Sequence, residues 1–128
     1  MVAFMINNLF NYEAVVVRVI DGDTIDCLVA LGFGITIKVR YRLNGIDTAE
    51  KDTPLGQRTK EQVKSLIEGK TVFLKSYKPD KYGRYLADVY TQLDAAKSLN
   101  QILIESGLAK PYGGENKAGL WTQAETNV

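Results

Sequence analysis

Three short polar segments carry the side chains best suited to chemistry. IDGDT at residues 20–24 contains two aspartates, RLNGIDTAE at 42–50 contains an arginine, an aspartate and a glutamate, and DKYGR at 80–84 ends in a second arginine. Carboxylates can bind a hard metal ion or orient water, and arginines can hold a phosphate through paired hydrogen bonds. Together these groups would suit hydrolysis of a phosphodiester, which needs a polarising cation, a base and fixed positive charge.

Each segment also has a simpler explanation when it is taken alone. Asp-Gly and Asn-Gly pairs are common turns, so IDGDT and the Asn44-Gly45 step can be turns followed by solvated carboxylates. DKYGR can likewise be a turn between two strands, with its charges serving solubility. Asp23 fits this view least well, because aspartate is disfavoured at the start of a strand unless its carboxylate binds something.

The composition excludes several classes of enzyme. The chain has no histidine and a single cysteine, Cys27. Ser-His-Asp and Cys-His catalysis are therefore excluded, as are the usual zinc sites and any disulfide within the chain. Any catalytic acids, bases and ligands must be carboxylates, arginines, lysines, tyrosines or a hard metal ion held by oxygen.

Length and charge predict one ordinary globular domain without naming its partner. The chain has 128 residues, of which 45% are hydrophobic and 24% charged, and its formal net charge is +1. Residues 1–10 lack the basic start and the apolar length of a signal peptide, and no run approaches a membrane span. We expect a soluble protein that is cytoplasmic by default, or secreted if the chain is a mature form.

The pattern along the chain indicates three strands, a helix, two strands and a second helix. Strands are expected at residues 12–20, 24–31, 35–43, 71–77 and 84–91, where the third alternates apolar residues with Lys38, Arg40 and Arg42. Helices are expected from Pro54, capped by Asp52 or Thr53, and from Ser98, with glycines 69 and 107 as stops. The first should bury a face made of Leu55, Val63, Leu66 and Ile67.

This order of elements favours an α+β, mainly β fold. We expect a five-stranded Greek-key barrel of the OB type with two packed helices, because five strands of this length make too small a sheet to leave both edges open. The domain should cover residues 11–112, between an N-terminal tail at 1–10 and a loosely ordered C-terminal tail at 113–128 whose one anchor is Trp121.

In order and approximate spacing, the three polar segments and the later ESGLAK at 105–110 resemble the motifs of the staphylococcal nuclease (thermonuclease) family. The resemblance covers roughly residues 12–112. It implies an OB-fold barrel with packed helices and a calcium-dependent nuclease that acts on DNA and RNA. In that family, water attacks phosphorus and the 5′ oxygen departs, which leaves 3′-phosphate ends.

The resemblance also implies roles for individual residues. Ca²⁺ would be bound by Asp23, Asp47 and the backbone carbonyl of Thr48, with Asp21 supporting these ligands from behind. Glu50 would be the general base or orient the water. The remaining site residues would hold phosphates or stack bases: Arg42, Arg84, Lys81, Tyr82 and, with a spacing one residue short, Tyr112. Since arginine does not readily release a proton, Arg84 is better suited to stabilising charge than to acting as an acid.

The chain departs from the family pattern in three places. Ala49 replaces the usual proline between the threonine and glutamate of the motif, and the segment from Glu50 to Pro54 is short. A third, C-terminal helix is expected to be short or absent, with the tail from Gly113 in its place. The first two differences should alter the loop that aims Glu50 and the edge of the site.

The distribution of charge supports a polyanionic partner. Cations fall on the third strand and around the fourth and fifth, where Lys75 and Lys78 could also be ordinary surface lysines. If the barrel brings these faces together, a basic groove with aromatic platforms follows, suited to single-stranded or frayed DNA or RNA bound by a monomer, with no membrane involved. A catalytically silent nucleic-acid- or protein-binding barrel and a purely structural Ca²⁺ site remain alternatives, but the retained acidic and arginine positions favour the enzyme.

Overall fold

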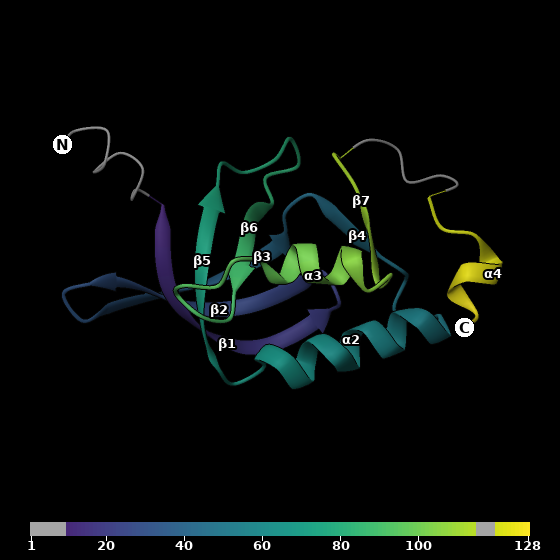
Figure 1. Ribbon diagram of the computed structural model, residues 1–128. Helices are drawn as coiled ribbons and strands as arrows, with labels where there is room; N and C mark the ends of the chain where they lie inside the picture. The colour runs from purple at the N-terminus through teal and green to yellow at the C-terminus, as the bar shows by residue number, and fades with distance from the viewer. Residues whose placement is uncertain (1–9, 115–119) are drawn as a thin grey trace.

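The computed structural model describes residues 10–114 and 120–128. The N-terminal tail expected at residues 1–10 therefore lies outside the described residues except for Phe10. Figure 1 shows a barrel with one long helix along its side and a shorter one across its end. The barrel strands are β1 (Asn11–Asp21), β2 (Thr24–Gly32), β3 (Ile35–Leu43), β5 (Thr71–Tyr77) and β6 (Tyr85–Tyr90).

The five strands close in the order β1-β2-β3-β6-β5, which confirms the predicted mainly β barrel. Only β3 and β6 run parallel, and they pair over a short stretch, Tyr41–Leu43 with Tyr85–Ala87. The long strand β1 pairs with both β2 and β5. Irregularities in its register with β2, beside Arg18 and Asp21, allow the strand to bend around the barrel.

Two very short strands were not expected from the sequence. β4 (Ile46–Thr48) and β7 (Ala109–Pro111) form a separate antiparallel pair in which Asp47 lies opposite Lys110. No strand was expected between residue 43 and Pro54, because a three-residue strand is too short for alternation to be visible in sequence. The pairing fixes the RLNGIDTAE segment against the later GLAK segment.

The alternating pattern of β3 was only partly correct as a guide to burial. Tyr41 and Leu43 are buried, but Ile35 is 53% and Ile37 is 45% exposed. Figure 1 is consistent with this difference, because the outer half of the β2–β3 hairpin projects beyond the barrel. The core itself is filled from all five barrel strands, including Tyr41 and Leu43 of β3, together with α2 and α3.

The helices begin and end close to the expected positions. In α2 (Pro54–Ile67), Thr53 caps the first turn and Pro54 stands at the first helical position. The prediction that Leu66 belongs to the buried face was wrong, since its side chain is 37% exposed. In α3 (Leu99–Glu105), Ser98 accepts a hydrogen bond from the Gln101 backbone, as its sequence suggested.

A buried asparagine connects α3 to the strands that carry the site. Asn100 accepts from Val89 N at 3.0 Å and donates to the carbonyl oxygens of Asn44 at 2.9 Å and Ala87 at 3.0 Å. It therefore holds β6, α3 and the turn after β3 together. This turn leads directly from Arg42 to Asp47.

The C-terminal residues differ from the expected loose tail over Leu120–Val128. A one-turn helix, α4 (Gln123–Thr126), begins with a capping box between Thr122 and Glu125, and Thr126 is buried. Lys110 joins β7 to this segment through Leu120 O at 2.7 Å and Glu125 Oε2 at 2.8 Å. A short third helix was one of the two expected outcomes. Across the described ranges, no helix has the length and apolar character needed to cross a membrane.

Candidate functional site

Two nearly buried carboxylates lie beside one guanidinium. Asp23, in the turn between β1 and β2, is 6% exposed, and Asp47 in β4 is 4% exposed. Nη2 of Arg42, near the end of β3, lies 2.9 Å from Asp47 Oδ1 and 3.5 Å from Asp23 Oδ2. The structure thus brings Asp23 of the IDGDT segment together with Arg42 and Asp47 of the RLNGIDTAE segment.

Backbone contacts fix the positions of these carboxylates. Thr48 N donates to Asp23 Oδ2 at 3.2 Å, and Leu43 N donates to Asp23 O at 2.8 Å. Thr48 therefore lies next to Asp23, as it must if both residues are to bind the same metal ion. Asp47 is held in turn by the pairing of β4 with β7.

The turn that carries both aspartates of IDGDT is packed against α2. A Cβ added to Gly22 would lie 2.6 Å from the Thr59 methyl carbon and 3.2 Å from the Thr48 side chain. Thr59 is fully buried and donates to Leu55 O at 2.8 Å, so it has little room to move. Glycine is therefore required here for close packing between the turn and the helix.

Asp21 has an unsatisfied buried oxygen next to this turn. Its Oδ1 is buried and makes no hydrogen bond with any part of the chain that the structure describes. A buried carboxylate oxygen without a partner is costly, and water or a cation commonly satisfies such a group. The unpaired oxygen of Asp21 therefore indicates that a water molecule or a cation can bind beside Asp23.

Glu50 follows β4 closely in sequence, and its backbone is held while its side chain is exposed. Its carbonyl oxygen accepts from Thr53 Oγ1 at 2.6 Å and Thr53 N at 3.0 Å. Gly56 in the first turn of α2 passes so close that an added Cβ would lie 1.8 Å from the same carbonyl oxygen. The side chain is exposed and makes no hydrogen bond or ion pair within residues 10–114 and 120–128.

The DKYGR motif forms a second cluster. Asp80 accepts from Arg84 Nε at 2.7 Å and from the backbone nitrogens of Tyr82 and Arg84 at 2.8 and 2.9 Å. The Arg84 guanidinium carbon and Lys81 Nζ lie 5.1 and 5.2 Å from the centre of the Tyr82 ring, which is 64% exposed. The pKa of Asp80 is lowered: burial acts in the opposite direction, but the hydrogen bonds from Arg84 and Tyr82 outweigh it.

Tyr112 and Trp121 complete the surroundings of the carboxylates. The guanidinium carbon of Arg42 lies 5.6 Å from the centre of the Tyr112 ring, which places this tyrosine at the site despite its shifted spacing. Trp121 Nε1 donates to Asp47 Oδ2 at 3.1 Å. Trp121 was expected only to anchor the tail, and its 74-residue separation from Asp47 left no local signal of this contact.

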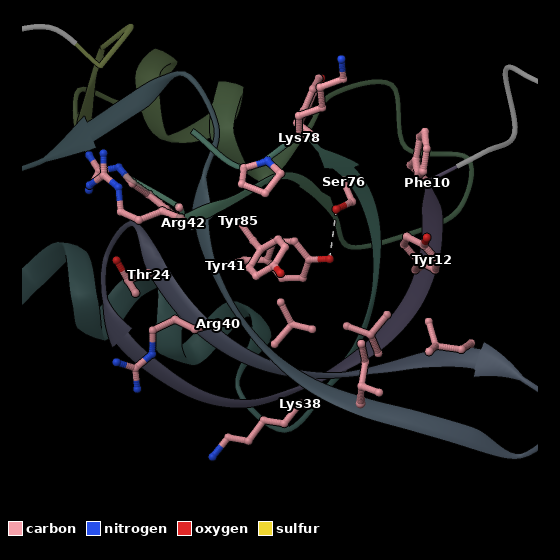
Figure 2. A pocket seen from close by; sticks show the side chains of 18 residues that line it. Phe10, Tyr12, Thr24, Lys38, Arg40, Tyr41, Arg42, Ser76, Lys78 and Tyr85 are labelled. Atoms are coloured by element: carbon pink, nitrogen blue, oxygen red, sulfur yellow. Dashed lines mark hydrogen bonds between the residues drawn. The ribbon is translucent and has the colours of Figure 1, made fainter. Parts of the chain in front are cut away.

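The two arginines expected to hold phosphate line one groove of about 830 Å³. Figure 2 shows Arg42 at one end of this groove, with Phe10 and Tyr12 at the other. Arg42 projects from β3 and Arg84 from the turn just before β6, and Arg84 makes its ion pair with Asp80 rather than with the central carboxylates. An anion in the groove would therefore meet arginines carried by two different segments of the chain.

The donor set at Asp23 and Asp47 suits a hard divalent cation. Two carboxylates and a neighbouring backbone carbonyl are oxygen ligands of the kind Ca²⁺ and Mg²⁺ prefer. In the described ranges no group of three or more acidic, histidine or cysteine side chains could hold a metal together. Because Ca²⁺ takes about 6–8 oxygen ligands, most of its shell here would come from water or substrate.

Several known proteins with similar sequences are named as nucleases. The model of a protein family described as staphylococcal nuclease homologue matches residues 40–125, which include the second and third polar segments. An uncharacterized endonuclease of Escherichia coli O157:H7 is 34% identical over 125 residues, which cover 86% of this chain and 77% of that protein. A micrococcal nuclease of Shigella flexneri is 32% identical over 108 residues, covering 80% of this chain and 59% of its own length. The chain therefore belongs to the staphylococcal nuclease family.

Proposed function

We propose that the protein is a calcium-dependent nuclease that hydrolyses phosphodiester bonds of DNA and RNA. Water would attack phosphorus and the 5′ oxygen would depart, leaving 3′-phosphate ends. The observation that carries the proposal is Arg42, which contacts Asp23 and Asp47 at the end of a groove that Arg84 also lines. Family membership and the nuclease names of its relatives support hydrolysis of nucleic acid as the reaction class.

Arg42 can hold the carboxylates and a phosphate at the same time. Its contacts with Asp23, Asp47 and the Ile46 carbonyl all use Nη2. Nε and Nη1 make no hydrogen bond within the described part of the chain, so each of them can still donate a hydrogen bond to a phosphate oxygen. The carboxylates thus orient the guanidinium without using its outer donors.

Asp23, Asp47 and the carbonyl of Thr48 would hold Ca²⁺, and Asp21 would accept hydrogen bonds from its water shell. When bound, the ion supplies Lewis-acid polarisation of a phosphoryl oxygen. The buried, unpaired oxygen of Asp21 supports this arrangement.

Glu50 and Arg84 would act on opposite sides of the phosphorus. The free carboxylate of Glu50 can accept a proton from the attacking water, while the bonds from Thr53 keep its backbone in place. Arg84 would stabilise negative charge on the leaving side, since its guanidinium stays protonated at neutral pH. Lys81 would contact a neighbouring phosphate, and Tyr82 and Tyr112 would stack bases.

The functional unit proposed here is larger than residues 11–112. Trp121 contacts Asp47 directly, and Glu125 pairs with Lys110 of β7. The C-terminal residues therefore belong with the site they support.

A single experiment separates the nuclease from a silent binding barrel. A 5′-labelled single-stranded oligonucleotide is incubated with the protein and Ca²⁺, and product ends are identified by mass spectrometry. We expect cleavage that EDTA stops, products that end in 3′-phosphate, and no cleavage by Glu50→Gln despite retained binding. Binding without any cleavage by the wild-type protein would instead establish the binding module, and cleavage that survives chelation would remove the metal role.

A further inference from the structure

The groove continues well beyond the residues assigned to the reaction. It runs from Arg42 and Arg84 between β3 on one side and the ends of β5 and β1 on the other. The gap exists because β3 pairs with β6 only from Tyr41 onward, which leaves the outer half of β3 unpaired on that edge. Figure 2 shows this extension, with Tyr41 and Tyr85 near its middle.

An exposed tyrosine is fixed within the groove directly after Arg84. Tyr85 is 50% exposed and meets the buried Tyr41 edge-on, with ring centres 6.4 Å apart and planes at 69°. Tyr41 is itself held by a hydrogen bond between its hydroxyl and Ser76 Oγ at 3.1 Å. This contact leaves a face of Tyr85 available to stack on a planar group, at little cost in side-chain freedom.

The far end of the groove is apolar and aromatic, while its rims are cationic. Phe10 and Tyr12 lie at that end, and the apolar Leu31 and Ile37 also line the groove. Lys38 and Arg40 lie on the β3 rim and Lys78 on the opposite one, and Figure 2 shows Lys38 and Lys78 reaching outward from opposite sides.

The rim cations differ in what already binds them. Arg40 is fixed by two hydrogen bonds to Asp26, at 2.7 and 3.1 Å. Lys38 and Lys78 have no ion pair within the described ranges. They are therefore free to bind a second, anionic molecule.

We propose that this extension binds the single-stranded polynucleotide on one side of the scissile phosphate, with a base stacked on Tyr85 and phosphates held by Lys38 and Lys78. The inference rests on the proposed function and adds residues that none of the nuclease motifs contains. A single strand fits because it presents both unpaired base faces and a charged backbone, which aromatic platforms between cationic rims recognise together. A duplex hides its base faces, and an apolar peptide would leave the two lysines unpaired.

The test measures binding in EDTA, so that cleavage plays no part. The probe is a fluorescein-labelled oligothymidylate of about twelve nucleotides, within the site size of about 4–16 nucleotides seen for single OB folds. Tyr85→Leu should weaken its binding by roughly 5- to 150-fold, the effect of losing one stacked base. Tyr85→Phe should retain the affinity because it keeps the ring.

Phe33→Leu is the matched control, since Phe33 is fully exposed at the tip of the β2–β3 hairpin and does not line the groove. It should bind like the wild-type protein. Unchanged binding by Tyr85→Leu, or an equal loss in Tyr85→Phe, would overturn the stacking role.

The salt dependence tests the lysines separately. The double variant Lys38→Gln/Lys78→Gln should lower the slope of log affinity against log salt by about 1.4, because each contact with a single strand contributes about 0.7. Lys64→Gln, on the exposed surface of α2, should leave the slope unchanged. An unchanged slope in the double variant, or equally tight binding of a duplex of the same length, would overturn the proposed single-strand track.

The outcome can be separated from that of the proposed nuclease. Cleavage of a dinucleotide by the wild-type protein with Ca²⁺ tests the reaction without needing the extension. If oligothymidylate bound no more tightly than the dinucleotide, the proposed binding role of the groove extension would be wrong, while the proposed reaction would stand. If the protein cleaved no substrate but its binding of oligothymidylate still depended on Tyr85, Lys38 and Lys78, the proposed reaction would be wrong and the groove extension would stand.

Discussion

Trp121 donates its indole N–H to Oδ2 of Asp47 at 3.1 Å, across 74 residues of sequence. The other oxygen of the same carboxylate accepts from Arg42. The orientation of Asp47 is thus set from two sides, once by β3 and once by the C-terminal segment. Outer hydrogen bonds of this kind orient metal ligands and raise metal affinity.

Replacing Trp121 by phenylalanine should therefore weaken divalent cation binding. The variant keeps an aromatic ring for Lys110, whose Nζ lies 4.8 Å from the ring centre, but it loses the hydrogen bond to Asp47. We expect Ca²⁺ affinity to fall by about 10- to 100-fold, measured by isothermal titration calorimetry. Thr122→Ser, which keeps a capping hydroxyl, serves as a control for the segment. Wild-type affinity in Trp121→Phe would show that the contact is only structural.

The same tryptophan provides a direct signal, because it is the only one in the chain. Its fluorescence should change when Ca²⁺ is added, since its hydrogen-bond partner Asp47 would become a metal ligand. Asp47→Asn should abolish the Ca²⁺-dependent change, whereas Asp94→Asn, at an exposed aspartate outside the site, should preserve it. A titration that proceeds equally in Asp47→Asn would place the metal elsewhere.

The sequence predicted that Asp23, Arg42 and Asp47 would lie together, and the contacts that it missed have physical causes. Asp23, Arg42 and Asp47 belong to local motifs, so residue types and spacing sufficed to predict their meeting. Trp121 reaches the site through a long-range contact that leaves no periodic pattern. The exposure of Ile37 could not be predicted either, because alternation shows which residues share a face and not how far a hairpin extends beyond its barrel.

Arg42→Lys should impair turnover although it keeps the charge. Lysine offers a compact ammonium group in place of a planar guanidinium, so one side chain can no longer contact both carboxylates and also donate to a phosphate from its other nitrogens. We expect kcat to fall by about 100- to 1,000-fold, as for the loss of a donor to the transition state. The matched control is Arg58→Lys at an exposed position of α2. Similar rates in the two variants would remove Arg42 from the reaction.

Thr53 connects the stability of α2 to the position of Glu50. Its hydroxyl accepts from Gly56 N as a helix cap and donates to Glu50 O. Thr53→Ala should lower the free energy of unfolding by about 1 kcal/mol and also reduce kcat, because the Glu50 backbone loses a contact. Thr53→Ser should restore both, which urea denaturation and steady-state kinetics would show. A loss of stability without any change in kcat would limit Thr53 to capping.

The Asp26–Arg40 pair should make stability depend on pH. The hydrogen bonds from the Arg40 guanidinium hold the pKa of Asp26 below its usual range, against the opposing effect of burial. A carboxyl whose pKa is lower in the folded than in the unfolded state stabilises the protein above its unfolded pKa of about 3.9. That contribution is lost as the pH falls through the folded pKa. Since Arg40 is 62% exposed, we expect about 1 kcal/mol or less.

Urea denaturation at neutral pH and at about pH 3 measures this contribution as the difference between wild type and Asp26→Asn. The wild-type advantage should be present at neutral pH and shrink on acidification, because the carboxyl of the unfolded chain is protonated first and that of the folded protein follows only as the pH approaches its lowered pKa. Glu61→Gln, at an exposed position on α2, controls for the loss of one negative charge. An advantage that is the same at both pH values would mean that Asp26 stabilises the barrel by packing and not by its charge.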